Sequence, residues 1–238
     1  MKPVIVVGGG RLGLSILHHA QPAPGHRPVA VVCRGRIPLP DGVAWFATVD
    51  AAVQKFPDGV VVDAAPGEEA GARFRAAVGR PLVVGTTGYE AGAAATLTQA
   101  ATRAPVVVAP NFSAGIAILR RVASLAAATG LWEIGIVDRH HRAKRDAPSG
   151  TARLLADTVS QAAAQVPEVV SLRQGEVVGE HTLHFAGVGE ELVFTHRATT
   201  REVFAAGAWR AVAFASSARP GTYSMDHVLG LTAAPDAP

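Results

Sequence analysis

The first half of the chain alternates short apolar runs with segments of helical periodicity. Valine-rich runs occupy residues 4–8, 29–33, 60–64, 82–85 and 106–109, and residues 12–20 repeat apolar side chains at the spacing of a helix face. Uninterrupted apolar runs between helices are typical of a parallel sheet that is buried on both faces. Because parallel crossovers are right-handed, the pattern predicts an α/β fold with a Rossmann-like doubly wound sheet.

The pattern changes after Gly115. Helical periodicity is expected over 116–129, 151–164 and 204–216, and a strand over 132–137. Polar and apolar residues alternate over 169–173, 177–184 and 191–198, as in half-buried antiparallel strands, with a turn at 187–189. These elements predict a second, α+β domain with a mixed or antiparallel sheet.

Composition and charge limit the classes of function. The 238 residues are 49% apolar and 17% charged, as in a folded globular protein. The net charge is only +3, and no basic stripe interleaves with aromatic residues, so no nucleic-acid partner is expected. Cys33 is the single cysteine, and neither a signal peptide nor a run long enough to span a membrane is visible. We therefore expect a cytoplasmic protein without a membrane partner.

A glycine loop follows the first predicted strand. Gly8, Gly10 and Gly13 have the spacing G-x-G-x-x-G, and the loop opens the first predicted helix. Such glycines permit a tight turn and close approach to a pyrophosphate, which the helix N-terminus attracts. The pattern predicts a dinucleotide site that includes Arg11 and Leu12, although glycines also end strands for purely structural reasons.

The end of the second predicted strand bears on the choice of cofactor. An acidic residue there binds a ribose 2′-hydroxyl, whereas an arginine accommodates a 2′-phosphate. The chain has Cys33, Arg34 and Arg36 at this point and no acid. Charge therefore favours NADPH, with NADH possible; in the alternative, the arginines are only solvated surface groups.

A basic cluster precedes the helix predicted at 151–164. Six of the seven residues from Arg139 to Arg145 can carry positive charge, in a chain whose net charge is +3. Ser149 can cap the helix, and the N–H groups of Gly150 and Thr151 can bind an anion. Lys144 and a histidine can contact the same anion from the loop, so we expect a small carboxylate or phosphate ligand.

The same cluster contains groups that exchange protons. His140 and Lys144 are candidates, because histidine titrates near neutrality and neighbouring positive charge is expected to lower the pKa of a lysine. We expect no metal, since adjacent His140 and His141 point to opposite faces of a strand and no cysteine or acidic ligand set accompanies them. A lone surface histidine or lysine is more often merely solvated.

Several segments together identify a resemblance. The chain resembles the dihydrodipicolinate reductase family in its glycine loop "GGGRLG", in "GTTGY" and "APNFSAGI", and in "HHRAKRDAPSGTA", which is close to a specific signature of that family. The later segments "VVGEHTLHF", "GEELVFTHRATTREVFAAGA" and "PGTYSMDHVLGL" resemble its C-terminal blocks in the same order.

The resemblance implies roles for residues and a division into domains. His140 and Lys144 would be the catalytic proton donors or acceptors. The dinucleotide-binding domain would comprise 1–113 and 212–238, and the substrate-binding and oligomerisation domain 114–211. The residues that would bind ligands are His141, Ser149, Gly150 and Thr151 for the substrate carboxylates, and Gly85, Thr86, Thr87, Ala109, Pro110, Asn111 and Phe112 for the nicotinamide end of the cofactor.

The chain departs from the family pattern in four places. Its glycine loop is one residue shorter, and Cys33 stands where an acid is common. "DAAPGEE" lacks the usual hydroxyl after Asp63, and the segment between Thr151 and His181 is shortened. The shortened segment lies in the assembly domain of the family. A homo-oligomer is still expected, but the usual tetramer is left open.

The expected function is NAD(P)H-dependent reduction of (hydroxy)tetrahydrodipicolinate to tetrahydrodipicolinate in the diaminopimelate/lysine pathway. Two alternatives stay open at this point. One is a related reductase of another cyclic imine or keto acid, and the other is a non-catalytic NADPH-sensing protein.

Overall fold

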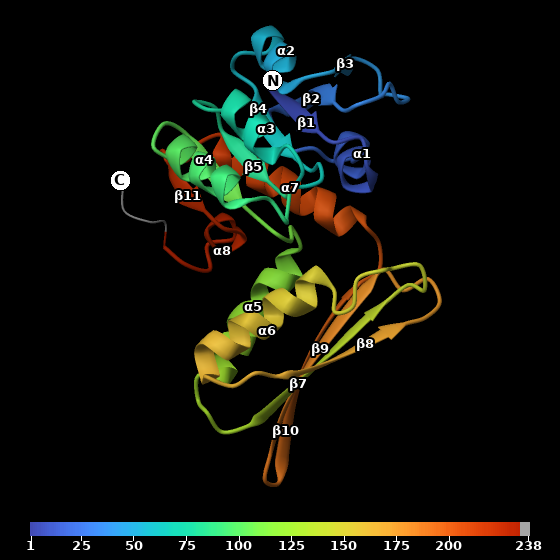
Figure 1. The fold of residues 1–238 in the computed structure, drawn as a ribbon, viewed down its shortest axis with the longest axis vertical. Coiled ribbons are helices and arrows are strands. Elements are labelled where there is room, and N and C mark those ends of the chain that lie inside the picture. The colour runs from blue at the N-terminus through green and yellow to red at the C-terminus, as the bar shows by residue number, and fades with distance from the viewer. Residues whose placement is uncertain (234–238) are drawn as a thin grey trace. The chain divides into compact units, whose positions relative to one another are not determined.

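The computed structural model describes residues 1–233, which divide into two units (Figure 1). The first unit comprises Met1–Ser113 and the chain from Glu202 onward, and the second comprises Ala114–Arg201. The chain returns to the first unit at Glu202 rather than at residue 212. The reason is that helix α7 (Glu202–Ala215) is continuous and packs as a whole against strands of the first unit.

A parallel sheet forms the centre of the first unit (Figure 1). In the described residues its strand order is β3-β2-β1-β4-β5-β6-β11, which contains the Rossmann order, with the reversal between β1 and β4. The five apolar runs form the five inner strands, whereas the two edge strands were not predicted because no valine-rich run marks them. The strands are β1 (Lys2–Val7), β2 (His26–Val32), β3 (Ala44–Phe46), β4 (Val60–Asp63), β5 (Leu82–Val84), β6 (Pro105–Val108) and β11 (Gly221–Tyr223).

Helices cover both faces of this sheet. On one face α2, α3 and α4 pack with Ile5, Val7 and Val61, and on the other α1 packs against α7. Trp209 of α7 donates its indole N–H to the carbonyl of Ile16 in α1 at 3.1 Å. Since both faces are buried, the strands need continuous apolar sequence. The remaining helices are α1 (Arg11–Leu17), α2 (Val49–Lys55), α3 (Ala70–Ala76), α4 (Ala91–Ala101) and α8 (Met225–Val228).

The second unit is a mixed four-stranded sheet with two helices on one face (Figure 1). Strands β7 and β9 and strands β9 and β10 are antiparallel, but β7 and β8 are parallel. The expectation of an antiparallel β8 was wrong, because α6 crosses over between β7 and β8 and returns the chain in the same direction. The elements are α5 (Ala114–Ala127), β7 (Glu133–His140), α6 (Gly150–Ala163), β8 (Glu168–Arg173), β9 (Gly179–Gly187) and β10 (Glu190–Ala198).

Strand alternation decides which side chains of β7 reach the interior. Ile134 and Ile136 point toward α5 and α6 and pack in the core. Asp138 and His140 continue this buried face, whereas Arg139 is less buried and pairs with Glu180. The polar end of an otherwise apolar face thus lies beside the start of α6.

Within residues 1–233, no helix combines the length and the apolar character needed to span a membrane.

The packing of α7 depends on Gly207. A Cβ atom there would lie 1.8 Å from the carbonyl oxygen of Phe112. We therefore expect Gly207→Ala to displace α7 and lower the free energy of unfolding by about 3 kcal/mol, the upper end for overpacking. Gly92→Ala is the matched control, since its Cβ would meet nothing closer than 3.9 Å. Thermal unfolding of both variants tests this; equal melting temperatures would contradict it.

Candidate functional site

The glycine loop after β1 is shaped by close backbone contacts. Gly8 has φ +113°, and a Cβ atom on it would lie 2.9 Å from the backbone of Ala64. A Cβ on Gly13 would lie 1.9 Å from the carbonyl oxygen of Gly8. Around Gly10, the N-cap of α1, there is open space. Gly8 and Gly13 are therefore needed for packing, while Gly10 leaves room for a ligand beside the helix start.

A cavity of about 640 Å³ lies at the carboxyl ends of β1, β2 and β4. It brings together Gly8, Gly10 and Arg34, three residues of the predicted cofactor set, and is also lined by Cys33. Among the described residues, Arg11, Leu12 and Gly13 do not line it. Sequence reasoning missed three acidic residues in its wall: Asp50, Glu68 and Glu69. Its place at the reversal of strand order is where nucleotides bind in such sheets.

The two predicted nicotinamide-side loops follow β5 and β6. A Cβ atom on Gly85 would lie 2.5 Å from Cε2 of Phe112, so the loops pack directly on each other. Ala109, Phe112 and Thr86 are buried, whereas Thr87 and Pro110 are exposed and Asn111 is half-buried. None of these residues lines the 640 Å³ cavity within residues 1–233. Their backbone and exposed atoms remain the groups available to a cofactor.

Sequence reasoning did not find the contacts of the buried Asp63 carboxylate at the end of β4. It accepts hydrogen bonds from the Thr86 hydroxyl at 2.5 Å and from Arg73 Nε at 2.8 Å. Arg73 also donates to the carbonyl of Pro66 at 2.7 Å. The Thr86 side chain is thus engaged by the protein. The arginine holds the loop after Asp63 in place.

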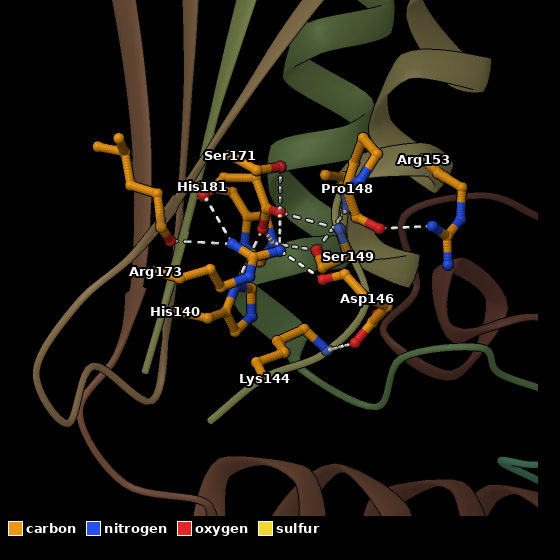
Figure 2. A network of polar contacts seen from close by, with 12 residues as sticks. His140, Lys144, Asp146, Pro148, Ser149, Arg153, Ser171, Arg173 and His181 are labelled. Carbon is orange, nitrogen blue, oxygen red and sulfur yellow. Dashed lines mark hydrogen bonds and ion pairs between the residues drawn. The ribbon is translucent and has the colours of Figure 1, made fainter. Parts of the chain in front are cut away.

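A second buried carboxylate organises the basic region of the other unit (Figure 2). Oδ2 of Asp138 accepts hydrogen bonds from the backbone N–H of Ser149 at 2.8 Å and from Arg173 Nη2 at 2.9 Å. Oδ1 lies 2.9 Å from Nδ1 of His140 and 3.4 Å from Nε2 of His181. Of the residues in this group, only His140 and Ser149 had a role predicted from the sequence.

The partners fix the charge of this group. Burial by itself would raise the pKa of Asp138, but donors from His140, His181, Arg173 and Ser149 outweigh burial and hold the pKa well below its ordinary value. Burial lowers the pKa of His181, despite its contact with Asp138. Asp138 is therefore ionised at neutral pH, and His181 is neutral.

Lys144 lies on the loop after β7, where its Nζ is 2.8 Å from Oδ1 of Asp146 (Figure 2). Burial would raise the pKa of Asp146, but the contact with Lys144 outweighs it and lowers the pKa. Lys144 is therefore the ion-pair partner of Asp146. With 23% of its side chain exposed, Lys144 is still accessible to a small ligand.

Ser149 caps α6, as its position predicts. Its hydroxyl accepts the N–H of Ala152 at 3.1 Å and lies 3.2 Å from Nε2 of His181. The side chain is buried, so its observed contacts are within the protein. Gly150 is exposed, with open space where its Cβ would lie, and Thr151 and His141 are half-buried. The start of α6 thus leaves room for an anion at Gly150.

One grouping bears on the expectation of no metal. Donor atoms of Asp138, His140 and His181 lie within 4.8 Å of one another, a spacing that a metal ion can use. The reason given for that expectation was wrong, because an acidic residue and a second histidine do accompany His140. The carboxylate already pairs with the Arg173 guanidinium, whose charge would repel a cation. We interpret the group as an ion-pair and hydrogen-bond network.

Comparison with known proteins agrees with this architecture. The family described as "Dihydrodipicolinate reductase, N-terminus" matches residues 2–112, and "Dihydrodipicolinate reductase, C-terminus" matches residues 115–229. A 4-hydroxy-tetrahydrodipicolinate reductase of Anaeromyxobacter dehalogenans is 36% identical, over 97% of this chain and 98% of that protein. One of Stenotrophomonas maltophilia is 38% identical over 235 residues, 96% of this chain and 98% of that protein, so the two chains are closely similar in length.

A solved structure shares the fold. It is the dipicolinate-bound dihydrodipicolinate reductase of Paenisporosarcina sp. TG-14, with a TM-score of 0.79 and 22% identity over 94% of this chain and 97% of that one. Both halves of the sequence match the two parts of one family, and the relatives are matched over nearly their whole length. On these grounds, the chain belongs to the dihydrodipicolinate reductase family.

Proposed function

We propose that the protein reduces 4-hydroxy-tetrahydrodipicolinate to tetrahydrodipicolinate with a nicotinamide cofactor, in the cytoplasm and in the diaminopimelate/lysine pathway. The observation that carries the proposal is the arrangement at one end of the second unit. There His140, at the end of β7, lies against an ionised aspartate, and Lys144 lies on the loop that follows β7 and leads to the open start of α6. The relatives named above carry this activity in their names.

The substrate would be held by its two carboxylates. Lys144 and His141 supply side-chain donors, and the first turn of α6 supplies N–H groups at Gly150 and Thr151, with Ser149 fixing that turn. The Paenisporosarcina protein was solved with dipicolinate, a planar dicarboxylate of the same class. Two anionic groups on one small ring match a site made from a lysine loop and a helix N-terminus.

The glycine loop and its cavity suit the cofactor in the first unit. Open space at Gly10 and the start of α1 fit a pyrophosphate, and Arg34 lines the same cavity. The residues of the β5 and β6 loops, Gly85 to Thr87 and Ala109 to Phe112, would contact the nicotinamide end through backbone and exposed atoms. When bound, NADPH supplies a hydride.

The chain's own residues would handle the protons. Loss of the 4-hydroxyl as water leaves a ring with conjugated C=N and C=C bonds, and reduction adds one hydride and one proton to it. Lys144 or His140 supplies that proton, directly or through water. The cationic loop and the helix start draw electron density from the ring, which favours hydride addition.

Loss of Lys144 tests the proposed chemistry. We expect Lys144→Ala to lower kcat by about 10²- to 10⁴-fold, the usual contribution of a general acid. The Kd for NADPH should stay unchanged, because the glycine-loop cavity lies in the other unit. The assay follows NADPH oxidation with substrate made by a coupled dihydrodipicolinate synthase, and Lys55→Ala on the exposed end of α2 is the control. Wild-type kcat in Lys144→Ala would refute the assignment, and inactivity of the wild type would refute the function.

We further propose that NADPH is preferred over NADH. Arg34 is exposed at the wall of the cavity, and Arg36 stacks its guanidinium over Trp45 at 5.4 Å, which holds the loop after β2. No acid follows β2 directly to repel a 2′-phosphate. Asp50 lines the cavity as well, at the start of α2, so the preference requires the attraction of Arg34 for a 2′-phosphate to exceed the repulsion from this carboxylate.

Replacement of Arg34 tests the preference for NADPH over NADH. We expect Arg34→Ala to reduce kcat/KM for NADPH by about tenfold, equivalent to ~1.4 kcal/mol, and to change kcat/KM for NADH little. Arg103→Ala, on the exposed surface after α4, controls for loss of net charge. Parallel losses with both cofactors would show that Arg34 does not read the 2′-phosphate.

A homo-oligomer is also proposed, because within the second unit the described helices, α5 and α6, pack on the same face of the mixed sheet. Its opposite face carries the row Val170, Val137, Thr182 and Thr195 across β8, β7, β9 and β10. Val170, Leu172 and Val193 on this face are 46%, 42% and 48% exposed. A second copy of the chain would cover these apolar side chains; whether the assembly is a tetramer is left to measurement.

Charge on that face should dissociate the assembly. We expect the double variant Val170→Glu, Leu172→Glu to elute as a smaller species than the wild type in size-exclusion chromatography with light scattering. Leu125→Glu, an exposed position on α5, is the control and should leave the mass unchanged. A monomeric wild type, or an unchanged mass in the double variant, would contradict the proposal.

A further inference from the structure

The two oxygens of the Asp138 carboxylate have different partners. Oδ2 accepts hydrogen bonds from three groups: the N–H of Ser149 at 2.8 Å, Nη2 of Arg173 at 2.9 Å and the hydroxyl of Ser171 at 3.1 Å. Oδ1 has contacts of another kind, with the imidazoles of His140 and His181. Oδ2 therefore connects β7 with β8 and the start of α6, and Oδ1 lies near the two histidines.

The nearer imidazole is that of His140. Its Nδ1 lies 2.9 Å from Oδ1, and both atoms are buried without an aligned hydrogen bond to another described group. A buried polar atom left unpaired costs about 1–3 kcal/mol, so a small rotation that aligns the two atoms is favoured. Because Asp138 is ionised, it can only accept, and Nδ1 of His140 must then carry the proton.

His181 does not compete as a charged group. Its Nε2 is farther from Oδ1, at 3.4 Å, and also contacts the Ser149 hydroxyl. Burial lowers its pKa, so it stays neutral beside His140, with the two rings edge to face at 5.2 Å between centroids. The charge of Asp138 is thus shared between Arg173, which is fixed, and His140, which lies at the end of β7.

The other ring nitrogen of His140, Nε2, lies beside a glycine. Continuing the antiparallel register of β7 and β9, the residue opposite His140 is Gly179. A Cβ atom on Gly179 would lie 3.0 Å from Nε2 of His140. Any larger residue would press on this nitrogen, whereas glycine leaves room for the ring to turn.

We propose that Asp138 is the positioning residue of the site, which binds Nδ1–H of His140 and leaves Nε2 as the nitrogen that exchanges protons. The inference rests on the proposed function, in which His140 exchanges a proton during reduction. Asp138 itself stays ionised throughout and does not contact the substrate. An oriented imidazole paired with a buried carboxylate is a recurrent way to fix a tautomer.

The first test measures the tautomer directly in the wild-type protein, and no variant has to turn over substrate. Long-range ¹⁵N–¹H correlation spectra of ¹⁵N-histidine-labelled protein, in slightly alkaline buffer, distinguish a protonated Nδ1 from a protonated Nε2. His140 is assigned by the loss of its signals in His140→Gln. In the neutral form of the ring we expect the proton on Nδ1. A proton on Nε2 would overturn the proposal, whether or not the wild type reduces the proposed substrate.

The second test uses Asp138→Asn, which keeps the shape but can offer an amide N–H to Nδ1. We expect the proton of His140 to move to Nε2 and kcat to fall by about 10²- to 10⁴-fold. KM for NADPH should stay within about twofold, since the cofactor cavity lies in the other unit. A wild-type kcat in this variant would overturn the proposal.

Two comparisons separate positioning from general damage to the fold. Asp157→Asn removes a carboxylate from the exposed surface of α6 and should leave both the spectrum and kcat unchanged. Gly179→Ala keeps Asp138 but crowds Nε2, so we expect lower kcat with the proton still on Nδ1. If Asp138→Asn lowered the melting temperature and kcat while His140 kept its wild-type tautomer, the role of Asp138 would be structural and the proposal wrong.

Discussion

A buried carboxylate, whose negative charge must be balanced by hydrogen-bond donors, connects the parts of the second unit. Removing an ion from water costs several kcal/mol unless good donors replace the water. Asp138 on β7 obtains its donors from β8, β9 and the start of α6. The pKa of Asp138 is lower in the folded protein than in the unfolded chain. At a pH above the pKa of the unfolded chain, the ionised carboxylate therefore stabilises the fold, and this stabilisation is lost as the pH falls from there through the pKa of the folded protein. The position of His140 and the start of α6 both follow from this one group.

The first unit repeats the arrangement with different residues. Asp63 ends β4, pairs with Arg73, accepts a hydroxyl from Thr86 and accepts the N–H of Ala65 at 3.1 Å. Asp138 likewise has an arginine, a serine hydroxyl and a loop N–H. In both units a buried aspartate near a strand end fixes the loops that follow neighbouring strands. Rigid loops at these positions are what a cofactor or substrate site needs, since misplacement by an ångström weakens binding and catalysis.

The sequence contained much of the fold but less of the site. Valine runs mark the five inner parallel strands, because burial on both faces requires continuous apolar sequence. His140, Lys144 and Ser149 are close in sequence, so a local motif reveals them. Arg173 and His181 come from other strands, and their contact with Asp138 depends on strand register that local patterns do not encode. One signal was available, since the period of two places Asp138 on the same face of β7 as His140.

The basic cluster itself shows how secondary structure divides a run of charge. Arg139 points to the face of β7 opposite His140, where Glu180 pairs with it and with Arg197. The Lys144 ammonium is balanced by Asp146, while Arg142 and Arg145 are exposed. The run of basic residues is therefore not one binding site. Arg139 and His140 lie on opposite faces of β7, and the other basic residues lie on the loop that follows. A ligand at the start of α6 would contact only those basic side chains that lie near the start of this helix.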